Sequence, residues 1–317
     1  MRTLITGACG FVGQYLRKRL AEENVEILGL DLNKDACIEG RYVQCDVLNF
    51  SLLEQTISSF QPDRVFHLAG LVHPAESQQH PRDYYQVNFQ GTVNLLEALR
   101  LTRSKARLLL ISSSEVYGGS FSSSPINETT NPKPLNHYAM SKLIAEQATL
   151  QYRLQNGLWT AIARPFNHSG SGQSPQFVVS DFCRQIAEAE MQTTDTSLKT
   201  ARLEVGNLSA EKDFLDVRDV VDAYVKLIEQ GSDGEIYNIC SGRGRVIRDI
   251  LDSAIRLSHM EIEVEISEKK FRPLQFPRQV GNNLKLRSTI NWEPCFDFQT
   301  TIIDTLTYWR AKAADRS

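Results

Sequence analysis

The N-terminal segment constrains this chain most, because an apolar strand runs directly into three evenly spaced glycines. Residues 3–6 are predicted to form a buried strand, and Gly7, Gly10 and Gly13 precede an amphipathic stretch at 14–23. A strand that turns through glycines into a helix presents backbone N–H groups where a pyrophosphate can bind. The spacing Gly-x-x-Gly-x-x-Gly differs from the standard Gly-x-Gly-x-x-Gly fingerprint, and an ordinary glycine loop is the alternative at this point.

A carboxylate follows the second apolar segment. Residues 25–30 are predicted to form the next strand, and Asp31 stands at its end, after Gly13 by the interval typical of dinucleotide sites. A carboxylate there accepts hydrogen bonds from the adenosine ribose hydroxyls and repels a 2′-phosphate. We therefore expect NAD(H) to be the preferred cofactor, with NADP(H) as the alternative.

Composition excludes several classes of protein. The 317 residues are 41% hydrophobic and carry a net charge of −3, which gives no basis for binding nucleic acid or a membrane surface. The six cysteines are scattered without the spacing of a zinc site, so no metal is expected. No apolar run is long enough to span a bilayer, and the first apolar segment is already assigned to a strand rather than a secretion signal. We expect a cytoplasmic protein with reduced cysteines.

Strand-like and helix-like segments alternate through the first half, which predicts a parallel sheet with helices on both faces. Long helices are expected at 82–101 and 136–155, and a polar loop at 118–134 suits the border of an active site. The predicted fold class is α/β, a Rossmann-type doubly wound parallel sheet with a smaller C-terminal substrate-binding lobe. The expected division is an NAD(P)-binding domain at 1–165 with the chain returning at 215–240, and a substrate lobe made mainly from 166–214 and 241–317.

Tyr138 and Lys142 are the strongest catalytic candidates from residue chemistry. At positions i and i+4 of a helix, both side chains lie on one face. A phenol has a pKa near 10, and a nearby ammonium group is expected to lower that pKa by stabilising the phenolate. A surface Tyr-x-x-x-Lys pair is the alternative for this spacing alone.

A run of hydroxyl groups supports the catalytic interpretation. A fifth strand is predicted at 106–112. Ser112 ends it and Ser113, Ser114 and Glu115 follow, at the carboxyl edge where doubly wound sheets bind ligands. A serine hydroxyl there can donate to a carbonyl or alkoxide oxygen of a substrate beside the tyrosine. The alternative is a serine-rich turn without a catalytic role.

These motifs together resemble the extended short-chain dehydrogenases that act on nucleotide sugars. In chain order, the matching motifs are Gly7-x-x-Gly10-x-x-Gly13, Asp31, Asp46-Val47, His67-Leu-Ala-Gly70, Asn88-x-x-Gly91-Thr92, the Ser-Ser-Ser-Glu-Val-Tyr-Gly run and Tyr138-x-x-x-Lys142. The resemblance covers nearly the whole chain. It implies the fold, a nicotinamide cofactor and a homodimer built on the helices near 82–101 and 136–155.

The resemblance also implies roles for individual residues. Ser113, Tyr138 and Lys142 would be the catalytic triad, with Glu115 as a further candidate. The residues expected to bind the cofactor are Gly7, Gly10, Phe11, Val12, Gly13, Asp31, Asp46, Val47, Leu68, Ala69, Gly70, Asn88, Ser112, Tyr138, Lys142, Pro165 and His168. The residues expected to contact the nucleotide sugar are Ser114, Glu115, Asn167, Arg202, Arg218 and Arg272.

The second half resembles the family of GDP-4-dehydro-6-deoxy-mannose reductases. The matching segments are Arg164-Pro-Phe-Asn167-His168-Ser-Gly-Ser-Gly-Gln173, Phe177 to Phe182, Val205 to Leu208, Asp213 to Asp219 and Tyr237 to Gly242. The resemblance implies a GDP-linked substrate, with Arg272 gripping the diphosphate through its planar fork. Three positions depart from the family pattern: Gln275 replaces a glutamate, Lys212 an arginine and Ser171 a proline. These changes leave the nucleotide base open.

Four functions are compatible with these motifs. We expect an NAD(P)H-dependent reductase of the C4 ketone in a nucleotide-linked 4-keto-6-deoxyhexose, most simply GDP-4-dehydro-6-deoxy-D-mannose reduced to GDP-D-rhamnose. A 4,6-dehydratase of the GDP-mannose type is the second candidate, because Glu115 occupies the position of the base that removes the C5 proton in those enzymes. A nucleotide-sugar 4-epimerase is the third. A non-catalytic NAD sensor is disfavoured because Tyr138 and Lys142 are both present.

Overall fold

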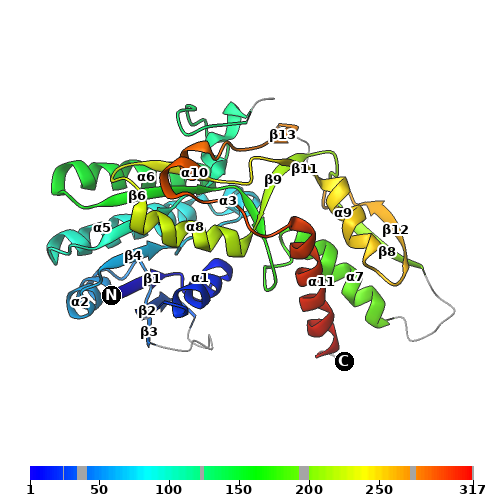
Figure 1. Ribbon diagram of the computed structural model, residues 1–317, viewed down its shortest axis with the longest axis horizontal. Helices are drawn as coiled ribbons and strands as arrows, with labels where there is room; N and C mark the ends of the chain where they lie inside the picture. The colour runs from blue at the N-terminus through cyan, green and yellow to red at the C-terminus, as the bar shows by residue number, and fades with distance from the viewer. Residues whose placement is uncertain (24, 34–40, 122–124, 193–199, 272–275, 316–317) are drawn as a thin grey trace.

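A seven-stranded parallel sheet forms the centre of the larger part of the molecule (Figure 1). The computed structural model describes residues 1–23, 25–33, 41–121, 125–192, 200–271 and 276–315. The strand order is β10-β6-β5-β4-β1-β2-β3. The strands are β1 Arg2–Thr6, β2 Glu26–Asp31, β3 Arg41–Gln44, β4 Arg64–His67, β5 Arg107–Ile111, β6 Thr160–Pro165 and β10 Ile236–Ile239.

The central strands are short apolar runs buried on both faces. Leu4 of β1 is fully buried and lies opposite Leu28 of β2 on one side and Val65 of β4 on the other. From β1 the chain builds the sheet outward through β2 and β3, and then crosses to β4 on the other side. The carboxyl ends of β1 and β4 therefore meet at the topological switch point, where ligands bind in such sheets.

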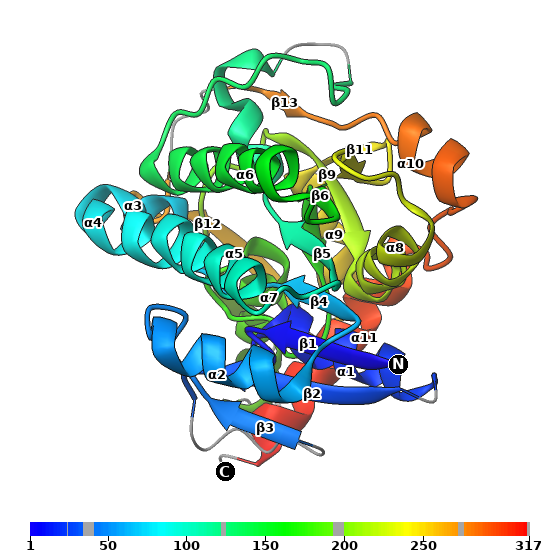
Figure 2. The same cartoon turned by 90° about the vertical axis from the view of Figure 1, so that its left-hand side faces the viewer.

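Helices cover both faces of the sheet, as Figure 2 shows. One layer holds α2 Phe50–Phe60, α5 Gly91–Leu101 and α6 His137–Asn156; the other holds α1 Phe11–Ala21, α8 Val217–Gln230 and α10 Leu284–Ile290. This arrangement confirms the predicted doubly wound α/β fold. Among the described residues, none of the helices is long and apolar enough to cross a bilayer.

The expected helix at 82–101 is broken into different helical types. The structure covers this range without a gap, with α4 Pro81–Tyr84, a π-helix, η1 Tyr85–Gln90, and then α5; a short helix, α3 Pro74–Gln79, precedes it. The wider turn of a π-helix inserts an extra residue without ending the helix, so apolar periodicity does not reveal it.

The smaller lobe packs helices against two short sheets, on the right of Figure 1. Its helices are α7 Val178–Gln192, α9 Ile247–Arg256 and α11 Phe298–Ala314, and its two-stranded sheet pairs β8 Thr200–Val205 with β12 Glu261–Ile266. A four-stranded sheet joins β7 Asn167–Ser169, β9 Glu211–Asp216, β11 Gly244–Val246 and β13 Arg278–Gln279. A 3-10 segment, η2 Ser114–Ser120, follows β5.

The chain crosses between the two parts more than once. It returns to the large sheet with α8 and β10, and again with α10, whose Leu286 and Ile290 pack in the core beneath the large sheet together with Trp292. The expected domain division placed 241–317 mainly in the substrate lobe, and α10 is a part of that range that packs on the large sheet. The division into folding units stays a prediction.

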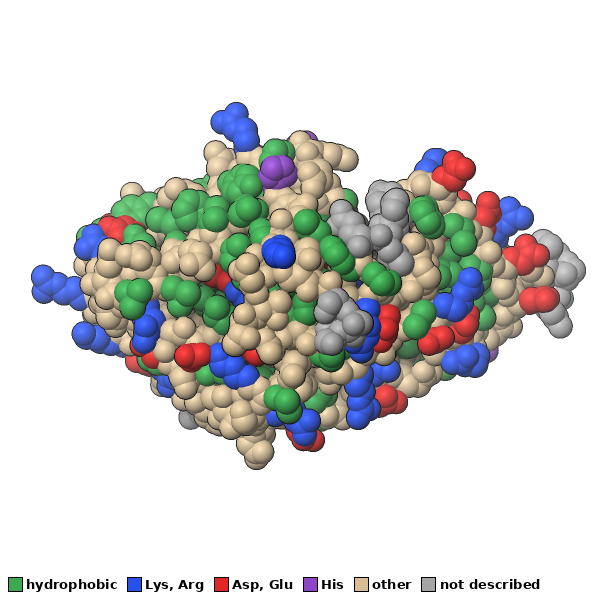
Figure 3. All heavy atoms as spheres, turned by 90° about the horizontal axis from the view of Figure 1, so that it is seen from above, with side chains coloured by type: hydrophobic (Ala, Val, Ile, Leu, Met, Phe, Trp, Pro, Cys, Tyr) green, Lys and Arg blue, Asp and Glu red, His purple; other side chains and the backbone are tan. Residues whose placement is uncertain are grey.

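Apolar side chains are partly exposed along the outer side of α6. Met140 is 38% and Leu154 is 71% exposed, and Leu143 and Ile144 are half-buried. Figure 3, which looks down on the molecule of Figure 1 from above, shows hydrophobic side chains (green) among polar ones on both halves of the view.

Candidate active site

The turn between β1 and α1 has no room for side chains at its glycines. Gly7 has a φ of +72°, and a Cβ there would lie 2.7 Å from the Ala69 nitrogen. A Cβ at Gly13 would lie 2.3 Å from the Gly7 oxygen. Gly10 caps α1 without a side-chain hydrogen bond, so the N–H groups of the first turn, at Phe11 and Val12, are available to an anion. This cradle fits a pyrophosphate.

Asp31 is fixed at the end of β2. Its Oδ2 accepts a hydrogen bond from the Cys9 backbone at 2.9 Å, and its Oδ1 accepts one from the Asn33 backbone at 3.2 Å. The Tyr42 hydroxyl donates to the Asp31 carbonyl oxygen at 2.9 Å. The carboxylate therefore lies beside the glycine turn, in the position expected to bind an adenosine ribose.

Asp46 and Val47 are held in the turn after β3. The Asp46 side chain accepts from the Leu48 backbone at 2.8 Å, and the Val47 carbonyl accepts from the Asn94 side chain at 3.0 Å. A Cβ at Gly91 would lie 2.6 Å from the Val47 side chain, which explains glycine at the start of α5. Their contact with adenine stays a prediction.

Asn88 on the π-helix ties down the loop after β4, the segment 68–71. Its Oδ1 accepts from the Leu71 backbone at 2.8 Å, and its Nδ2 donates to the Leu71 carbonyl at 3.0 Å and to the Ser141 hydroxyl at 2.9 Å. A Cβ at Gly70 would lie 2.8 Å from Asn88 Oδ1 and 3.1 Å from Lys142 Nζ. Asn88 thus fixes the loop around the lysine, whereas direct contact with a cofactor stays a prediction.

Tyr138 and Ser113 are brought together as expected. Both are 7% exposed, and they come from the first turn of α6 and the end of β5. Burial raises the pKa of the Tyr138 phenol, while its hydrogen bond with Ser113 lowers that pKa; the charge of Glu115 raises it further. The net rise in pKa is opposite to the expected fall, because desolvation is larger than the favourable contacts of the phenolate.

Lys142 lies one turn further along α6 and is 5% exposed. Its Nζ donates a hydrogen bond to the Ile111 carbonyl at 2.9 Å. Burial lowers the pKa of Lys142 to about 8, and the Glu146 carboxylate opposes this fall. The ammonium group is therefore still charged at neutral pH.

The remaining residues of the serine run point in different directions. Ser112 donates to Glu146, and Ser113 Oγ accepts from the Glu115 backbone at 3.2 Å. The Glu115 carboxylate accepts from the Asn136 side chain at 3.4 Å, and Ser114 is 8% exposed. Ser112 thus faces the interior behind the triad rather than a ligand.

The segment after β6 lies against the glycine turn. The His168 ring stacks on Phe11 at a centroid distance of 6.2 Å and an interplanar angle of 4°. The Asn167 side chain donates to the Asp213 carbonyl at 3.1 Å, and Pro165 is the last residue of β6. Burial lowers the pKa of His168, so the imidazole is neutral beside the helix N-terminus.

Asp213 on β9 is fully buried and binds two loops, one after β10 and one at Gly281. Its carboxylate accepts from the Ser241 backbone at 2.8 Å, the Ser241 hydroxyl at 2.7 Å, the Gly242 backbone at 3.0 Å and the Gly281 backbone at 3.4 Å. Burial raises the pKa of Asp213 while these donors lower it.

The three arginines proposed to contact the nucleotide differ in their surroundings. Arg202 on β8 is exposed and pairs with Glu265 of β12 at 3.1 Å. Arg218 pairs with Asp216 at 2.7 Å and with Asp304 at 2.8 Å. Arg272 lies outside the described residues, as does Gln275. The structure does not bring Arg202 or Arg218 to the triad, and each already has a carboxylate partner.

The buried contacts of His67 and the ion pair of Glu146 with Arg164 were not expected from the sequence. His67 contacts the Thr6 hydroxyl at 2.7 Å and the Thr92 hydroxyl at 3.0 Å, and burial lowers its pKa to about 3. Glu146 forms an ion pair with Arg164 behind Lys142. The spacing of Glu146 from Lys142, one helical turn, is the signal that could have found it.

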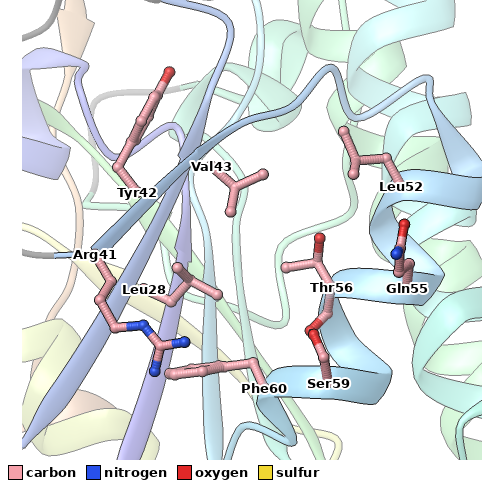
Figure 4. Close-up of a pocket in the computed structure, with 9 residues that line it drawn as sticks. All are labelled: Leu28, Arg41, Tyr42, Val43, Leu52, Gln55, Thr56, Ser59 and Phe60. Carbon is pink, nitrogen blue, oxygen red and sulfur yellow. The ribbon is translucent and has the colours of Figure 1, made fainter.

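A separate cavity of about 420 Å³ opens between β3 and α2 (Figure 4). It is lined by Leu28, Arg41, Tyr42, Val43, Leu52, Gln55, Thr56, Ser59 and Phe60. Because β3 is the edge strand and three strands separate it from β5, this cavity is remote from the serine run. Within the described part of the chain, no group of His, Cys, Asp and Glu is arranged to hold a metal ion.

Comparison with known proteins identifies the family of the chain. The family profile described as "GDP-mannose 4,6 dehydratase" matches residues 4–305. The chain belongs to this family, within the extended short-chain dehydrogenases. It is 34% identical to GDP-6-deoxy-D-mannose reductase of Pseudomonas aeruginosa, covering 99% of both chains.

Two further comparisons place the chain within this family. The chain is 28% identical to GDP-6-deoxy-D-talose 4-dehydrogenase of Aggregatibacter actinomycetemcomitans, over 96% of this chain and 97% of that one. Its structure matches RMD from Pseudomonas aeruginosa complexed with NADPH with a TM-score of 0.86 and 33% identity, over 98% of each chain. The resemblance inferred from the motifs is thereby confirmed.

Proposed function

We propose that the protein is an NAD(P)H-dependent reductase of the C4 ketone in GDP-4-dehydro-6-deoxy-D-mannose, with GDP-D-rhamnose as the product. The observation that carries this proposal is that Ser113, Tyr138 and Lys142 lie together at the carboxyl end of β5. A relative of nearly equal length that is named a GDP-6-deoxy-D-mannose reductase supports it.

Tyr138 is the proton donor in this proposal. When bound, the dihydronicotinamide supplies the hydride to C4. Because burial raises the pKa of Tyr138, the phenol keeps its proton at neutral pH and can give it to the developing C4 alkoxide. Ser113 orients the same oxygen, and the positive charge of Lys142 stabilises the tyrosinate that results.

The cofactor fits the cradle described above. Gly7, Gly10 and Gly13 leave room for the pyrophosphate, the α1 N-terminus supplies N–H donors, and Asp31 faces the ribose position. The carboxylate of Asp31 favours NADH, and a structural neighbour with NADPH supports acceptance of both cofactors.

The GDP-linked sugar is proposed to bind between the serine run and the segment after β6. Ser114, Glu115 and Asn167 are the described side chains assigned to it, with Arg202, Arg218 and Arg272 as further proposals for the nucleotide. The name of the relative supports GDP over other nucleotides.

The test is a direct assay with GDP-4-dehydro-6-deoxy-D-mannose. A reductase consumes one NADH for each sugar reduced, and the C4 configuration of the product is read by NMR. Tyr138→Phe is expected to lower turnover about 10²-fold or more while NADH still binds. Bound NADH without turnover in the wild type would favour a cofactor sensor instead.

A 4,6-dehydratase activity is the second candidate. Glu115 supports it, because its carboxylate acts on the pKa of the Tyr138 phenol and therefore lies within electrostatic reach of it. Incubation with GDP-mannose separates the two activities: a dehydratase releases water without net consumption of cofactor. A 4-epimerase would interconvert two GDP-sugars, again without consuming NADH.

A homodimer and a cytoplasmic location complete the proposal. The partly exposed apolar residues on α6 support pairing through α5 and α6. Sedimentation of the wild type and of Met140→Glu tests this arrangement, since an added carboxylate should dissociate a dimer formed there.

A further inference from the structure

Glu146 and Arg164 form a buried ion pair beside the catalytic candidates. The Glu146 side chain is fully buried and that of Arg164 is 2% exposed. Arg164 Nε lies 2.9 Å from Glu146 Oε1 and Arg164 Nη2 lies 2.6 Å from Oε2, a two-pronged contact that joins β6 to α6.

This ion pair is connected to Lys142 on two sides. Lys142 and Glu146 are one turn apart on the same face of α6. Lys142 donates to the carbonyl of Ile111, and the next residue, Ser112, donates to Glu146. Adjacent residues at the end of β5 therefore fix the positions of the Lys142 ammonium group and the Glu146 carboxylate relative to each other.

An ion pair at this depth needs a reason beyond stability. Removing two charges from water is expensive, and well-packed apolar residues are often at least as stable in such places. Arg164 also lies over the Tyr117 ring, 4.8 Å from its centroid, and its Nη1 has no hydrogen-bond partner among the described residues. Besides Arg164, a carboxylate retained here exerts its field on a second buried cation, Lys142, with little screening.

We propose that Glu146 and Arg164 are positioning residues that set the charge of Lys142: Glu146 holds the lysine protonated, and Arg164 limits that attraction so that the ammonium group stays on the Ile111 carbonyl. The inference rests on the proposed function. Neither residue touches the substrate; both act through Lys142.

Other elements packed around Tyr138 and Lys142 contribute less negative charge. His67 on β4 is neutral, because burial lowers its pKa to about 3. Tyr84 on α4 meets Tyr138 edge to face at 6.2 Å, and Tyr224 on α8 has its pKa raised by burial. Glu115 on η2 acts on Tyr138. Glu146 is thus the carboxylate that acts on Lys142 itself.

The test compares variants that change the charge of the pair in opposite directions. Glu146→Gln leaves Arg164 unopposed, so the pKa of Lys142 should fall by about one unit or more. Arg164→Gln leaves the carboxylate unopposed, so the pKa should rise. The double variant replaces the pair by neutral groups, and the pKa of Lys142 should return to within roughly half a unit of its wild-type value.

Two measurements read the outcome. One is the pH midpoint of NADH-dependent reduction. The other is the NMR titration of the Lys142 Cε signal in the protein without substrate, assigned by its loss in Lys142→Met. Because the second needs no turnover, an inert wild type would count against the proposed function alone. The charge-setting role would be overturned if the pH midpoints of Glu146→Gln and Arg164→Gln moved in the same direction, or if they did not move.

Arg164→Lys keeps the charge and provides a variant less prone to unfolding. Its midpoint should stay within roughly 0.3 units of the wild type, even though the two-pronged contact is lost. A midpoint displaced as far as in Arg164→Gln would show that geometry rather than charge is sensed, and would also overturn the inference.

Discussion

Lys142 loses its charge at a pH close to the working range, because burial lowers the pKa of its ammonium group to about 8. We therefore predict that kcat/KM for reduction falls as the pH rises through about 8, where the tyrosinate loses its stabilising neighbour. Lys142→Met should have a low kcat/KM at every pH and should not show this fall at high pH. Lys226→Met, which removes a half-buried lysine paired with Asp222, is the control and should keep the wild-type profile.

His67 links residue chemistry to stability. Its folded-state pKa is about 3, below the ordinary value of 6.5. Between these two pH values the unfolded chain binds a proton at this imidazole and the native protein does not. Stability from this group is present above pH 6.5 and is lost as the pH falls, by up to about 1.4 kcal/mol per unit. Urea unfolding between pH 7 and pH 4 should show this slope, and His67→Gln should reduce it. An equal slope in the variant would refute the assignment.

At the scale of elements, the β1–α1 turn is the most sensitive point. A methyl group at Gly13 would lie 2.3 Å from the Gly7 oxygen, so Gly13→Ala must push the helix from the strand. We predict a loss of about 1–3 kcal/mol in unfolding free energy and at least tenfold weaker NADH binding, measured by fluorescence titration. Gly119→Ala has its nearest neighbour at 3.5 Å and is the matched control. Equal NADH affinity in the two variants would contradict this picture.

The elements also show what sequence patterns could predict. The glycine turn and the pairing of Tyr138 with the serine run follow from local spacing and from the rule that parallel strands end at one edge. β9 was not predicted because Glu211, Lys212 and Asp213 interrupt its apolar pattern, and Asp213 is buried only because donors from distant loops satisfy it. The π-helix and the Glu146–Arg164 pair depend on tertiary contacts that periodicity does not record.

On the scale of the whole molecule, Asp213 connects the smaller lobe to the large sheet, since it receives donors from the segment after β10 and from Gly281. Asp213→Ala would leave these buried N–H groups without an acceptor, at about 1–3 kcal/mol each at most. We predict a higher KM for the nucleotide sugar, with a much smaller change in NADH affinity. An unchanged KM in a folded variant would show that the lobes keep their arrangement without this carboxylate. Asp249→Ala, at an exposed position of α9, is the control.

The late position of β10 in the chain has a consequence for biosynthesis. Because Ile236–Ile239 pairs with β6 at the edge of the large sheet, a ribosome must make most of the protein before that sheet is complete. Until then β6 has an unpaired margin, and the nascent cofactor half is open to strand exchange with other chains. Release of a chain shortened before Ile236 should therefore yield aggregates rather than a small dinucleotide-binding fragment.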